Sequence, residues 1–475
     1  MQQTQTLHSR YNPKGEAERY IDSLSINKEI RYFILIEPGQ GYLAAPLRKL
    51  NPEAKIIALH AQALPELSAE ENISDAFWAP VMDLSLWEFL EQEIPETEAA
   101  FIKLIEWRPG LAVYGEAYHF LLKETVEFIK QADASYRTAR QFGKRWFRNF
   151  FRNLGFISEV LCPYPFSFPL LISGAGPGLE ETIPLLKKER ENFLILSVSS
   201  SVPALYQNNI EPDLIISTDG GGWALLHLYE CLRPEKDRKL QLAVSMSAAL
   251  PSQVKNSSLL LISDGSLWQE IILRKLGIPY ITLPQRGTVT AAALDLAFAL
   301  SEEKVYLTGL DLGLKDIQTH VRPYSFDRIW IEKGSRFNPV YSQTFSRSRQ
   351  LLAGRSHDIY ASWFSRQLAA YPQRLHTLGP NNPLFHNIKI SAPETFSQKA
   401  GNEVFFKIFS FAGKQNFAKT AALFLIESME NVQYESKLKE ELSPFLLPQK
   451  TKASGDELEE AILGITKVYW EESNG

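Results

Sequence analysis

The sequence predicts an α/β protein with two Rossmann-like parallel sheets and a helical C-terminal region. Three observations support this. Short apolar runs alternate with helical patterns, which is typical of parallel sheets covered by helices. A glycine-rich turn follows the first strand of each sheet, at Gly39 and Gly41 and again at 174–178. The chain has 475 residues, which is enough for two or three domains.

We therefore expect four regions. Residues 1–115 form a smaller N-terminal Rossmann-like domain, and residues 116–164 form a helical connector. Residues 165–390 form the core domain, and residues 391–475 form a mostly helical C-terminal region.

Composition excludes several classes of protein. The chain is 45 % hydrophobic and 22 % charged, with a net charge of −5 and both signs mixed. Nothing global indicates nucleic-acid or membrane binding, and no apolar stretch approaches the ~20 residues of a membrane span. The polar N-terminus is not typical of a signal peptide. The cysteines, Cys162 and Cys231, lack metal-ligand spacing. We expect a cytoplasmic protein.

In the first region, YFILIEPGQGYLAAPLRKL reads as strand, turn and helix, and KIIALH reads as a second strand. A dinucleotide site needs a carboxylate at the end of this second strand, to bind ribose hydroxyls. Here that end reads Leu59-His60-Ala61. We expect a Rossmann-like scaffold with a weak or lost site.

The connector carries basic residues at steps of three or four, so they share one helix face. These are Arg137, Arg140, Lys144, Arg148 and Arg152. The face is either solvated or a wall that faces an anionic ligand or partner.

The core is predicted from seven apolar runs. They are PLLIS, FLILSV, DLIIST, LQLAVSM, SLLLIS, YITLP and KVYLTG. Because ligands bind beyond the carboxyl ends of parallel strands, the residues that follow each run are the candidates for a site. Small, polar or acidic residues follow nearly every one, which predicts a cleft for a polar ligand.

The loop after the first of these strands is Gly174-Ala175-Gly176-Pro177-Gly178. Its glycines allow close backbone approach, and a helix N-terminus behind it attracts anions. The spacing matches neither the dinucleotide fingerprint nor the Walker motif. The loop therefore predicts a phosphate or nucleotide site without naming the nucleotide.

Other strand ends add candidate groups. Asp219 could bind a ribose hydroxyl or a metal ion, and Asp264 and Asp311 could complete a Mg²⁺ site with it. His320 is suited to proton transfer near pH 7. Thr288 opens a helix of small residues that we expect to pack on the sheet.

Together, SGAGPGLEETIPLL, SVSSSVPALYQNNIEPDLIISTDGG and GTVTAAALDLAFALSEEKVYLTGLDL with His320 resemble the DUF115 family. That family includes bacterial motility accessory factors and archaeal 6-hydroxymethylpterin diphosphokinases, whose shared core is MptE-like. The resemblance covers roughly residues 165–325. The flanking regions and the chain length favour the accessory-factor branch, which carries a Rossmann-like region before the core and a helical region after it.

The resemblance implies a glycosyltransferase with a sialyltransferase-like core. Its donor would be a CMP-activated nonulosonic acid of the pseudaminic or legionaminic type, and its acceptor Ser or Thr of flagellin. No metal would be obligatory. The implied catalytic residues are Asp311 and His320. The implied nucleotide-binding residues are Gly174, Ala175, Gly176, Pro177, Gly178, Ser199, Ser200, Asp219, Gly220 and Thr288.

Arg322, Arg328 and Arg336 are candidates for binding the sugar carboxylate. The sequence departs from the family at Gly178, where serine is common. Two alternatives remain open. A diphosphokinase would need ATP and Mg²⁺, with Asp219, Asp264 and Asp311 as ligands, whereas a flagellin-binding chaperone or scaffold would need neither the loop nor His320.

Overall fold

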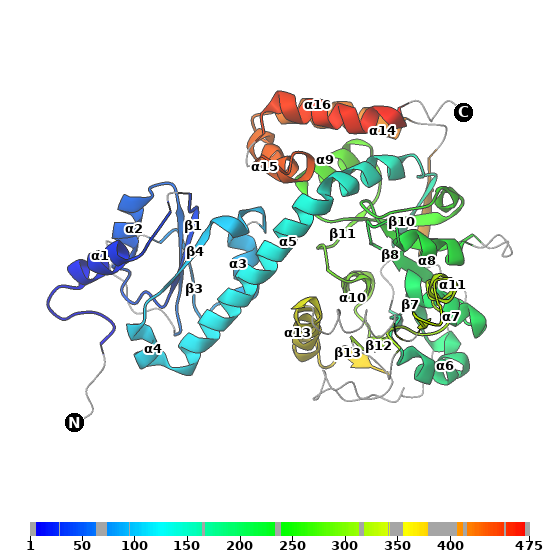
Figure 1. The fold of residues 1–475 in the computed structure, drawn as a ribbon, viewed down its shortest axis with the longest axis horizontal. Helices are drawn as coiled ribbons and strands as arrows, with labels where there is room; N and C mark the ends of the chain where they lie inside the picture. Colours follow the sequence, from blue (N-terminus) through cyan, green and yellow to red (C-terminus); the bar gives the residue numbers. More distant parts are fainter. Residues whose placement is uncertain are drawn as a thin grey trace. The chain divides into compact units, whose positions relative to one another are not determined.

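In the computed structural model, the chain folds into two compact units, residues 1–141 and 142–475 (Figure 1). The described residues are 6–27, 29–62, 74–94, 96–163, 167–232, 239–312, 318–340, 342, 355–378, 406–411, 416–450 and 453–470. The predicted domain boundaries at 164–165 and 390–391 lie outside the described residues, so those bounds stay a prediction.

The N-terminal unit contains a parallel sheet of four described strands in the order β3-β2-β1-β4. The strands are β1 (Tyr32–Ile36), β2 (Lys55–Leu59), β3 (Ala76–Trp78) and β4 (Ile102–Glu106). The helices are α1 (Pro13–Ser23), α2 (Ala44–Leu50), α3 (Leu86–Glu93), η1 (Glu96–Phe101), α4 (Pro109–Tyr114) and α5 (Glu116–Leu154).

Two hydrophobic clusters hold this sheet, one on each face. Alternate residues of β1 explain the division, since Phe33 and Leu35 face α1 and α2, whereas Ile34 and Ile36 face α3 and the first part of α5. The predicted turn follows β1, and Gly39 and Gly41 have φ of 62° and 85°, which favour glycine.

The core unit contains a sheet of ten described strands. They are β5 (Glu159–Pro163), β6 (Leu170–Ser173), β7 (Leu194–Val198), β8 (Leu214–Ser217), β9 (Gln241–Ser245), β10 (Ser258–Ser263), β11 (Ile281–Thr282), β12 (Val305–Thr308), β13 (Leu375–Thr377) and β14 (Phe406–Ser410). The order is β13-β12-β6-β7-β8-β9-β10-β5-β14, with β11 beside β10. All described pairings are parallel except that of β14 with β5.

Helices cover this sheet in two hydrophobic clusters. The first includes α6 (Leu179–Lys188), α10 (Val289–Leu300) and α13 (Arg355–Ala370). The second includes the end of α5, α8 (Ala224–Cys231), α9 (Leu267–Lys275), α14 (Phe417–Glu430), α15 (Glu435–Leu446) and α16 (Gly455–Thr466). Shorter helices are η2 (Arg190–Asn192), η3 (Ser199–Ser201), α7 (Val202–Gln207), η4 (Ser252–Asn256), α11 (Asp327–Glu332) and η6 (Lys467–Tyr469).

The predicted fold class is confirmed. All seven predicted core strands are present as β6 to β12, and α10 begins after the predicted Thr288. The capping box of Ser454 and Glu457 opens α16, as its spacing predicts. The sequence did not predict β5, β13 or β14. β14 lies in the region expected to be helical, and four of its five residues are exposed, so no buried pattern marks it.

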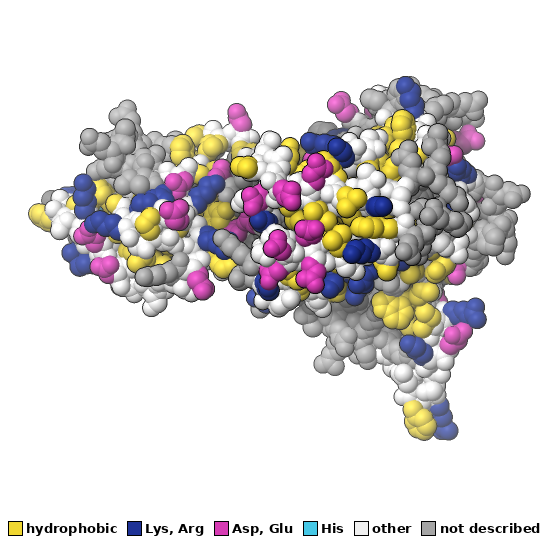
Figure 2. All heavy atoms as spheres, turned by 90° about the horizontal axis from the view of Figure 1, so that it is seen from above, with side chains coloured by type: hydrophobic (Ala, Val, Ile, Leu, Met, Phe, Trp, Pro, Cys, Tyr) yellow, Lys and Arg dark blue, Asp and Glu magenta, His cyan; other side chains and the backbone are white. Residues whose placement is uncertain are grey.

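The basic face of α5 is mostly solvated. Arg137, Arg140, Lys144 and Arg148 are exposed, whereas an N–H of Arg152 donates to the Leu250 carbonyl. Lys and Arg side chains also lie among Asp and Glu on the face in Figure 2, which fits the mixed charge of the chain. No helix among the described residues is long and apolar enough to cross a membrane.

Candidate functional site

The candidate site lies where the strand order of the core sheet reverses. From β6 the chain proceeds through β7 to β10 on one side, and β12 returns to pair with β6 on the other. The loops after β6 and β12 therefore leave the sheet at its topological switch point, where open α/β sheets bind ligands. These loops are the predicted 174–178 loop and the segment Gly309 to Asp311.

Two glycines of the loop are needed for strand packing. A Cβ on Gly174 would lie 2.4 Å from the Gly309 carbonyl oxygen. The Gly174 N–H donates to Thr308 O over 2.8 Å, and the Gly176 N–H donates to Gly309 O over 2.8 Å. These N–H groups serve the fold, although the sequence interpretation directed them at the ligand.

Gly178 has a different partner. Its N–H donates to Oδ2 of Asp311 over 2.9 Å, and a Cβ on Gly176 would lie only 2.0 Å from the same oxygen. Gly178 is the N-cap of α6 and has no side chain to cap the helix. A carboxylate from the neighbouring strand end therefore supplies the anionic oxygen that a helix N-terminus attracts. Asp311 marks an anion position.

The predicted base, His320, lies beside this loop. The N–H of the next residue, Val321, donates to Ala175 O over 2.9 Å. Oε1 of Glu180, in the first turn of α6, accepts from Gln318 Nε2 at 2.6 Å and from Arg322 N at 3.0 Å. Sequence reasoning missed Glu180, which holds the segment on both sides of His320.

The ring of His320 is held on one side by stacking and on the other by a hydroxyl. It stacks on Tyr324 with ring centroids 4.1 Å apart and an angle of 13°, and Nδ1 lies 3.0 Å from Oγ1 of Thr319. If Nδ1 carries the proton and donates to Thr319, the lone pair of Nε2 is the basic one.

The residues that follow His320 in the chain pack against α8. His227 of α8 contacts the rings of Tyr324 and Phe326 at 5.2 and 5.1 Å, and its Nδ1 lies 3.0 Å from Oγ of Ser325. Burial lowers the pKa of His227 to about 4, so this imidazole is neutral at pH 7. Residues 318–326 thus connect the loop after β6 with the helix after β8.

The predicted serines lie in η3, after β7. Ser199 is buried, and Ser200 is half-buried. Next to them, Oγ of Ser201 donates to the Ser173 carbonyl over 2.9 Å and lies 2.8 Å from Oγ of Ser197. The hydroxyls of Ser197 and Ser201 thus join β6 to β7. Of the two predicted contacts, Ser200 is the more accessible, because it is only half-buried.

Asp219 forms a turn after β8. Its side chain is exposed, and Oδ1 accepts from the Gly221 N–H at 2.7 Å, an Asx-type turn. Gly220 is buried against Trp146 of α5, since a Cβ there would lie 2.3 Å from the indole Cδ1. Nδ2 of Asn149 donates to Gly220 O and Ser247 O over 3.1 and 3.0 Å. Sequence reasoning did not select Trp146 or Asn149 as positioning residues.

Thr288 is the N-cap of α10, where Oγ1 accepts from the Ala291 N–H at 3.1 Å. Because α10 packs on β6 and β7 and leads into β12, its N-terminus lies at the carboxyl edge of the sheet. Gly287 before it lies against the ring of Tyr360, and Arg286 pairs with Asp295 over 2.6 Å. Thr288 thus lies at the carboxyl edge of the sheet, and its hydroxyl serves as a helix cap.

The three predicted metal carboxylates do not meet. Asp311, Asp219 and Asp264 follow β12, β8 and β10, so Asp311 is three strands from Asp219 and five from Asp264. Because neighbouring strands lie about 4.8 Å apart, Asp311 is separated from Asp219 by about 14 Å and from Asp264 by about 24 Å. In the described part of the chain, no group of three or more His, Cys, Asp or Glu side chains could hold a metal ion.

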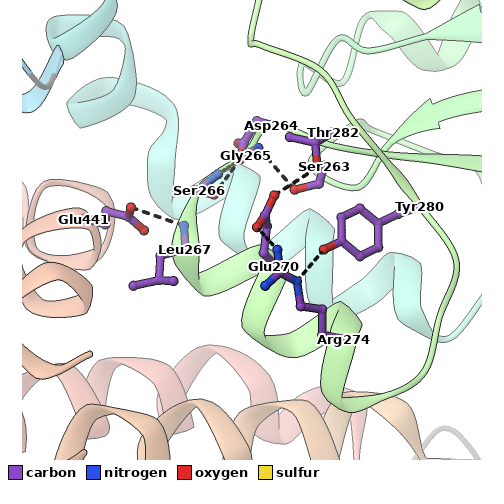
Figure 3. A network of polar contacts seen from close by, with 10 residues as sticks. All are labelled: Ser263, Asp264, Gly265, Ser266, Leu267, Glu270, Arg274, Tyr280, Thr282 and Glu441. Atoms are coloured by element: carbon purple, nitrogen blue, oxygen red, sulfur yellow. Dashed lines mark hydrogen bonds and ion pairs between the residues drawn. The ribbon is translucent and has the colours of Figure 1, made fainter. Parts of the chain in front are cut away.

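Asp264 instead belongs to a polar network at the start of α9 (Figure 3). Its Oδ1 accepts from Ser266 N at 3.0 Å, and its Oδ2 accepts from Gln269 Nε2 at 2.8 Å. Beside it, Glu441 of α15 accepts from the Leu267 N–H at 3.2 Å (Figure 3). It also accepts from the Trp268 N–H at 3.4 Å. Burial raises the pKa of both carboxyls, that of Glu441 to about 7.

The three predicted arginines differ in place. The backbone of Arg322 is held at the loop by Glu180. Arg328 pairs with Glu332 of α11 over 2.8 Å and is 88 % exposed. Arg336 is also exposed. The contacts to the loop therefore favour Arg322 as the residue near a ligand there.

Comparisons with known proteins show what this segment of the chain is similar to. Residues 144–316 match the family model described as "6-hydroxymethylpterin diphosphokinase MptE-like". The resemblance predicted from the motifs is thus confirmed for the segment that contains the loop, Asp219, Thr288 and Asp311. His320 follows that segment by four residues.

Two uncharacterized proteins of Treponema pallidum (strain Nichols) are related to the chain. One is 28 % identical over 321 residues, which are 66 % of this chain and 69 % of that protein. The other is 26 % identical over 115 residues, which are 24 % of this chain and 55 % of that protein. A solved structure, the MAf glycosyltransferase from Magnetospirillum magneticum AMB-1, aligns with a TM-score of 0.46 and 13 % identity over 96 % of this chain and 78 % of that one.

Proposed function

We propose that the protein is a glycosyltransferase that uses a nucleotide-activated sugar at the β6–β12 switch point. The finer proposal is a CMP-activated nonulosonic acid of the pseudaminic or legionaminic type as donor and Ser or Thr of flagellin as acceptor. One observation carries it: the Asp311 carboxylate lies on the Gly178 N–H, beside the segment that holds His320.

The carboxylate indicates the chemistry of the ligand. Phosphate oxygens accept from helix N-terminal N–H groups as carboxylates do. In the proposed complex the donor phosphate takes the Gly178 N–H, and Asp311 moves away from it. Repulsion between the two anions favours that movement. Thr288 and Ser200 are the proposed further contacts to the nucleotide, and Arg322 is the proposed partner of the sugar carboxylate.

The transfer step needs one base. The bond between the anomeric carbon and the phosphate oxygen breaks, CMP leaves with both electrons, and the acceptor oxygen bonds to the anomeric carbon. Nε2 of His320 takes the hydroxyl proton. Asp311 then stabilises the imidazolium by its charge, so His320 is the proposed base and Asp311 the proposed electrostatic partner.

The diphosphokinase alternative is favoured by the description of the matching family. It would bind ATP with Mg²⁺. The wide separation of Asp219, Asp264 and Asp311 does not support these three carboxylates as its metal ligands. A third candidate, a flagellin-binding chaperone, would not need His320.

Thermal-shift measurements on the intact chain test the donor. We expect CMP to raise Tm in the presence of EDTA, because a ligand at 100 times its Kd stabilises by about 2.7 kcal/mol. Stabilisation by ATP with Mg²⁺ but not by CMP would contradict the transferase and favour the diphosphokinase.

A transfer assay tests the acceptor. Unmodified flagellin incubated with the chain and the CMP-activated sugar should gain the mass of one or more sugar residues. Binding of flagellin without any mass gain, in an enzyme that binds CMP, would contradict this acceptor chemistry and favour the chaperone.

A further inference from the structure

The N-terminal unit has its own switch point, between the carboxyl ends of β1 and β4. The chain leaves β1 for β2 on one side, and β4 returns to pair with β1 on the other. Glu37 and the Gly39–Gly41 turn follow β1, and Trp107 follows β4. The sequence interpretation expected a lost dinucleotide site here, because no carboxylate ends the second strand.

A carboxylate is nevertheless present, at the end of the first strand. Glu37 is 2 % exposed and has φ of 47°, a conformation that glycine favours and other residues adopt at a cost. Its Oε2 accepts from the Ala61 N–H at 2.6 Å, and its Oε1 lies 3.6 Å from Nδ1 of His60. A buried acid thus lies at the switch point, on a backbone conformation that is costly for a residue other than glycine.

Polar atoms around Glu37 lack hydrogen-bond partners. Among the described residues these include Nδ1 of His60 and the hydroxyl of Tyr118, whose side chains are almost fully buried. A Cβ on Gly110 would lie 2.8 Å from Cγ of Glu37 and 3.2 Å from Cδ2 of Tyr118, so the two side chains meet at this glycine. An unpartnered buried hydroxyl is costly, and a ligand hydroxyl could satisfy it.

The imidazole ring of His8 occupies the Gly39–Gly41 turn after β1. The imidazole of His8 stacks on Trp107, with ring centroids 5.3 Å apart and an angle of 25°, and contacts Tyr42 edge-on at 4.9 Å. Its Nε2 accepts from the Gln40 N–H at 3.1 Å. That tautomer carries its proton on Nδ1, which is buried without a partner. A nucleobase can make the same stacking and the same hydrogen bond.

The charges nearby select against phosphate. Burial lowers the pKa of His8, and the Glu16 and Glu37 carboxylates oppose that shift, so both act on the ring. Burial raises the pKa of Tyr118, and the negative charge of Glu106 raises it further. Arg108 lowers this pKa, but its effect is smaller than that of Glu106. An acidic surrounding suits hydroxyls and repels phosphate.

We propose that this switch point binds a nucleoside without phosphate, whose base replaces His8 on Trp107 and whose ribose hydroxyls bond to Glu37 and Tyr118. The site belongs to the N-terminal unit and is independent of the transferase proposal.

Calorimetric titration of the intact chain with adenosine, guanosine, cytidine and uridine tests this. His8→Ala should bind one of them about tenfold more tightly than the wild type, because the competing ring is gone. Glu37→Gln and Tyr118→Phe in that background should each weaken binding about tenfold. Tyr118→Phe keeps the ring and its packing, so it remains informative if Glu37→Gln does not fold.

The controls separate the two sites. Gly176→Leu, in the core loop, should leave nucleoside binding unchanged, and the 5′-monophosphates should bind more weakly than the nucleosides at this site. The proposal is overturned if no nucleoside binds to His8→Ala at millimolar concentration. It is also overturned if Tyr118→Phe has no effect, or if Gly176→Leu removes the binding.

Discussion

The two switch points of the molecule are both filled by a side chain, and the two side chains differ in kind. In the core unit the Asp311 carboxylate accepts the Gly178 N–H, whereas in the N-terminal unit the neutral ring of His8 accepts the Gln40 N–H. The Asp311 carboxylate thus occupies the position that we propose for a phosphate, and the His8 imidazole occupies the position that we propose for a nucleobase. The side chain that occupies each switch point thus resembles the ligand that we propose for it.

The largest effect is expected from a substitution that disrupts the core turn alone. Gly176→Leu would place Cβ 2.0 Å from Oδ2 of Asp311 and 2.7 Å from Gly309 O, and the latter is a backbone atom that cannot move far. We expect loss of measurable sugar transfer, with nucleoside binding at the N-terminal turn retained. The control is Gly464→Ala in α16, where a Cβ meets nothing within 4 Å. It should keep full activity and gain about 0.5–1 kcal/mol of stability.

Removing the base comes next in size. His320→Gln should lower kcat about 10²- to 10⁴-fold with little change in donor KM, since a general base acts in the transition state. His119→Gln, on the exposed surface of α5, is the matched control. Steady-state kinetics over pH 5–9 would contradict the role of His320 if the variant retained the rate and pH profile of the wild type.

A subtler change sharpens the role of the core occupant. Asp311→Asn keeps the shape of the side chain and removes its charge, so a phosphate competes more easily for the Gly178 N–H. We expect donor KM to fall about threefold to tenfold while kcat also falls about tenfold. A rise in KM would mean that the carboxylate helps to hold the donor, contrary to the proposed exchange.

The last prediction concerns stability and not activity. It involves a third carboxylate that accepts from backbone N–H groups, Glu441 at α9, which we regard as a helix cap and not as a ligand site. Burial raises its pKa to about 7 from 4.5, so the folded chain holds an extra proton between these values. Stability attributable to this group falls as pH rises from about 4.5 to 7, by up to about 3 kcal/mol.

Glu441→Gln should therefore be less stable than the wild type at pH 5, through the loss of one acceptor, and equal or more stable at pH 8. Denaturant unfolding at both pH values measures this. Glu435→Gln in the same helix, an exposed partner of Lys439, should shift stability by less than about 0.5 kcal/mol at either pH. A change in sugar transfer at pH 5 by Glu441→Gln would contradict the assignment as a cap.

Much of the fold was predictable because strands β6 to β12 are apolar runs with small residues at their ends. The edge strand β14 was not, since four of its five residues face solvent and carry no periodic pattern. At the site, the sequence located the loop, Asp311 and His320 on neighbouring segments. It could not assign the loop N–H groups, because their partners Thr308, Gly309 and Asp311 lie more than 130 residues away.

Glu37 shows a different kind of failure. It stands directly before the glycine turn, but the dinucleotide fingerprint places its carboxylate at the end of the second strand, so the fingerprint does not predict an acid at the end of the first. Its backbone angle, its burial and the unpartnered Tyr118 hydroxyl depend on tertiary packing and have no signal in the sequence.

The asparagines of α5 carry a chemical vulnerability. The Nδ2 groups of Asn149 and Asn153 each donate to two strand-end carbonyls, and both residues are buried. Hydrolysis of either side-chain amide, a reaction of ageing proteins, would exchange a double donor for a carboxylate that faces two carbonyl oxygens. The turns after β8 and β9 would then be pushed apart from within, although no atom of their own had changed.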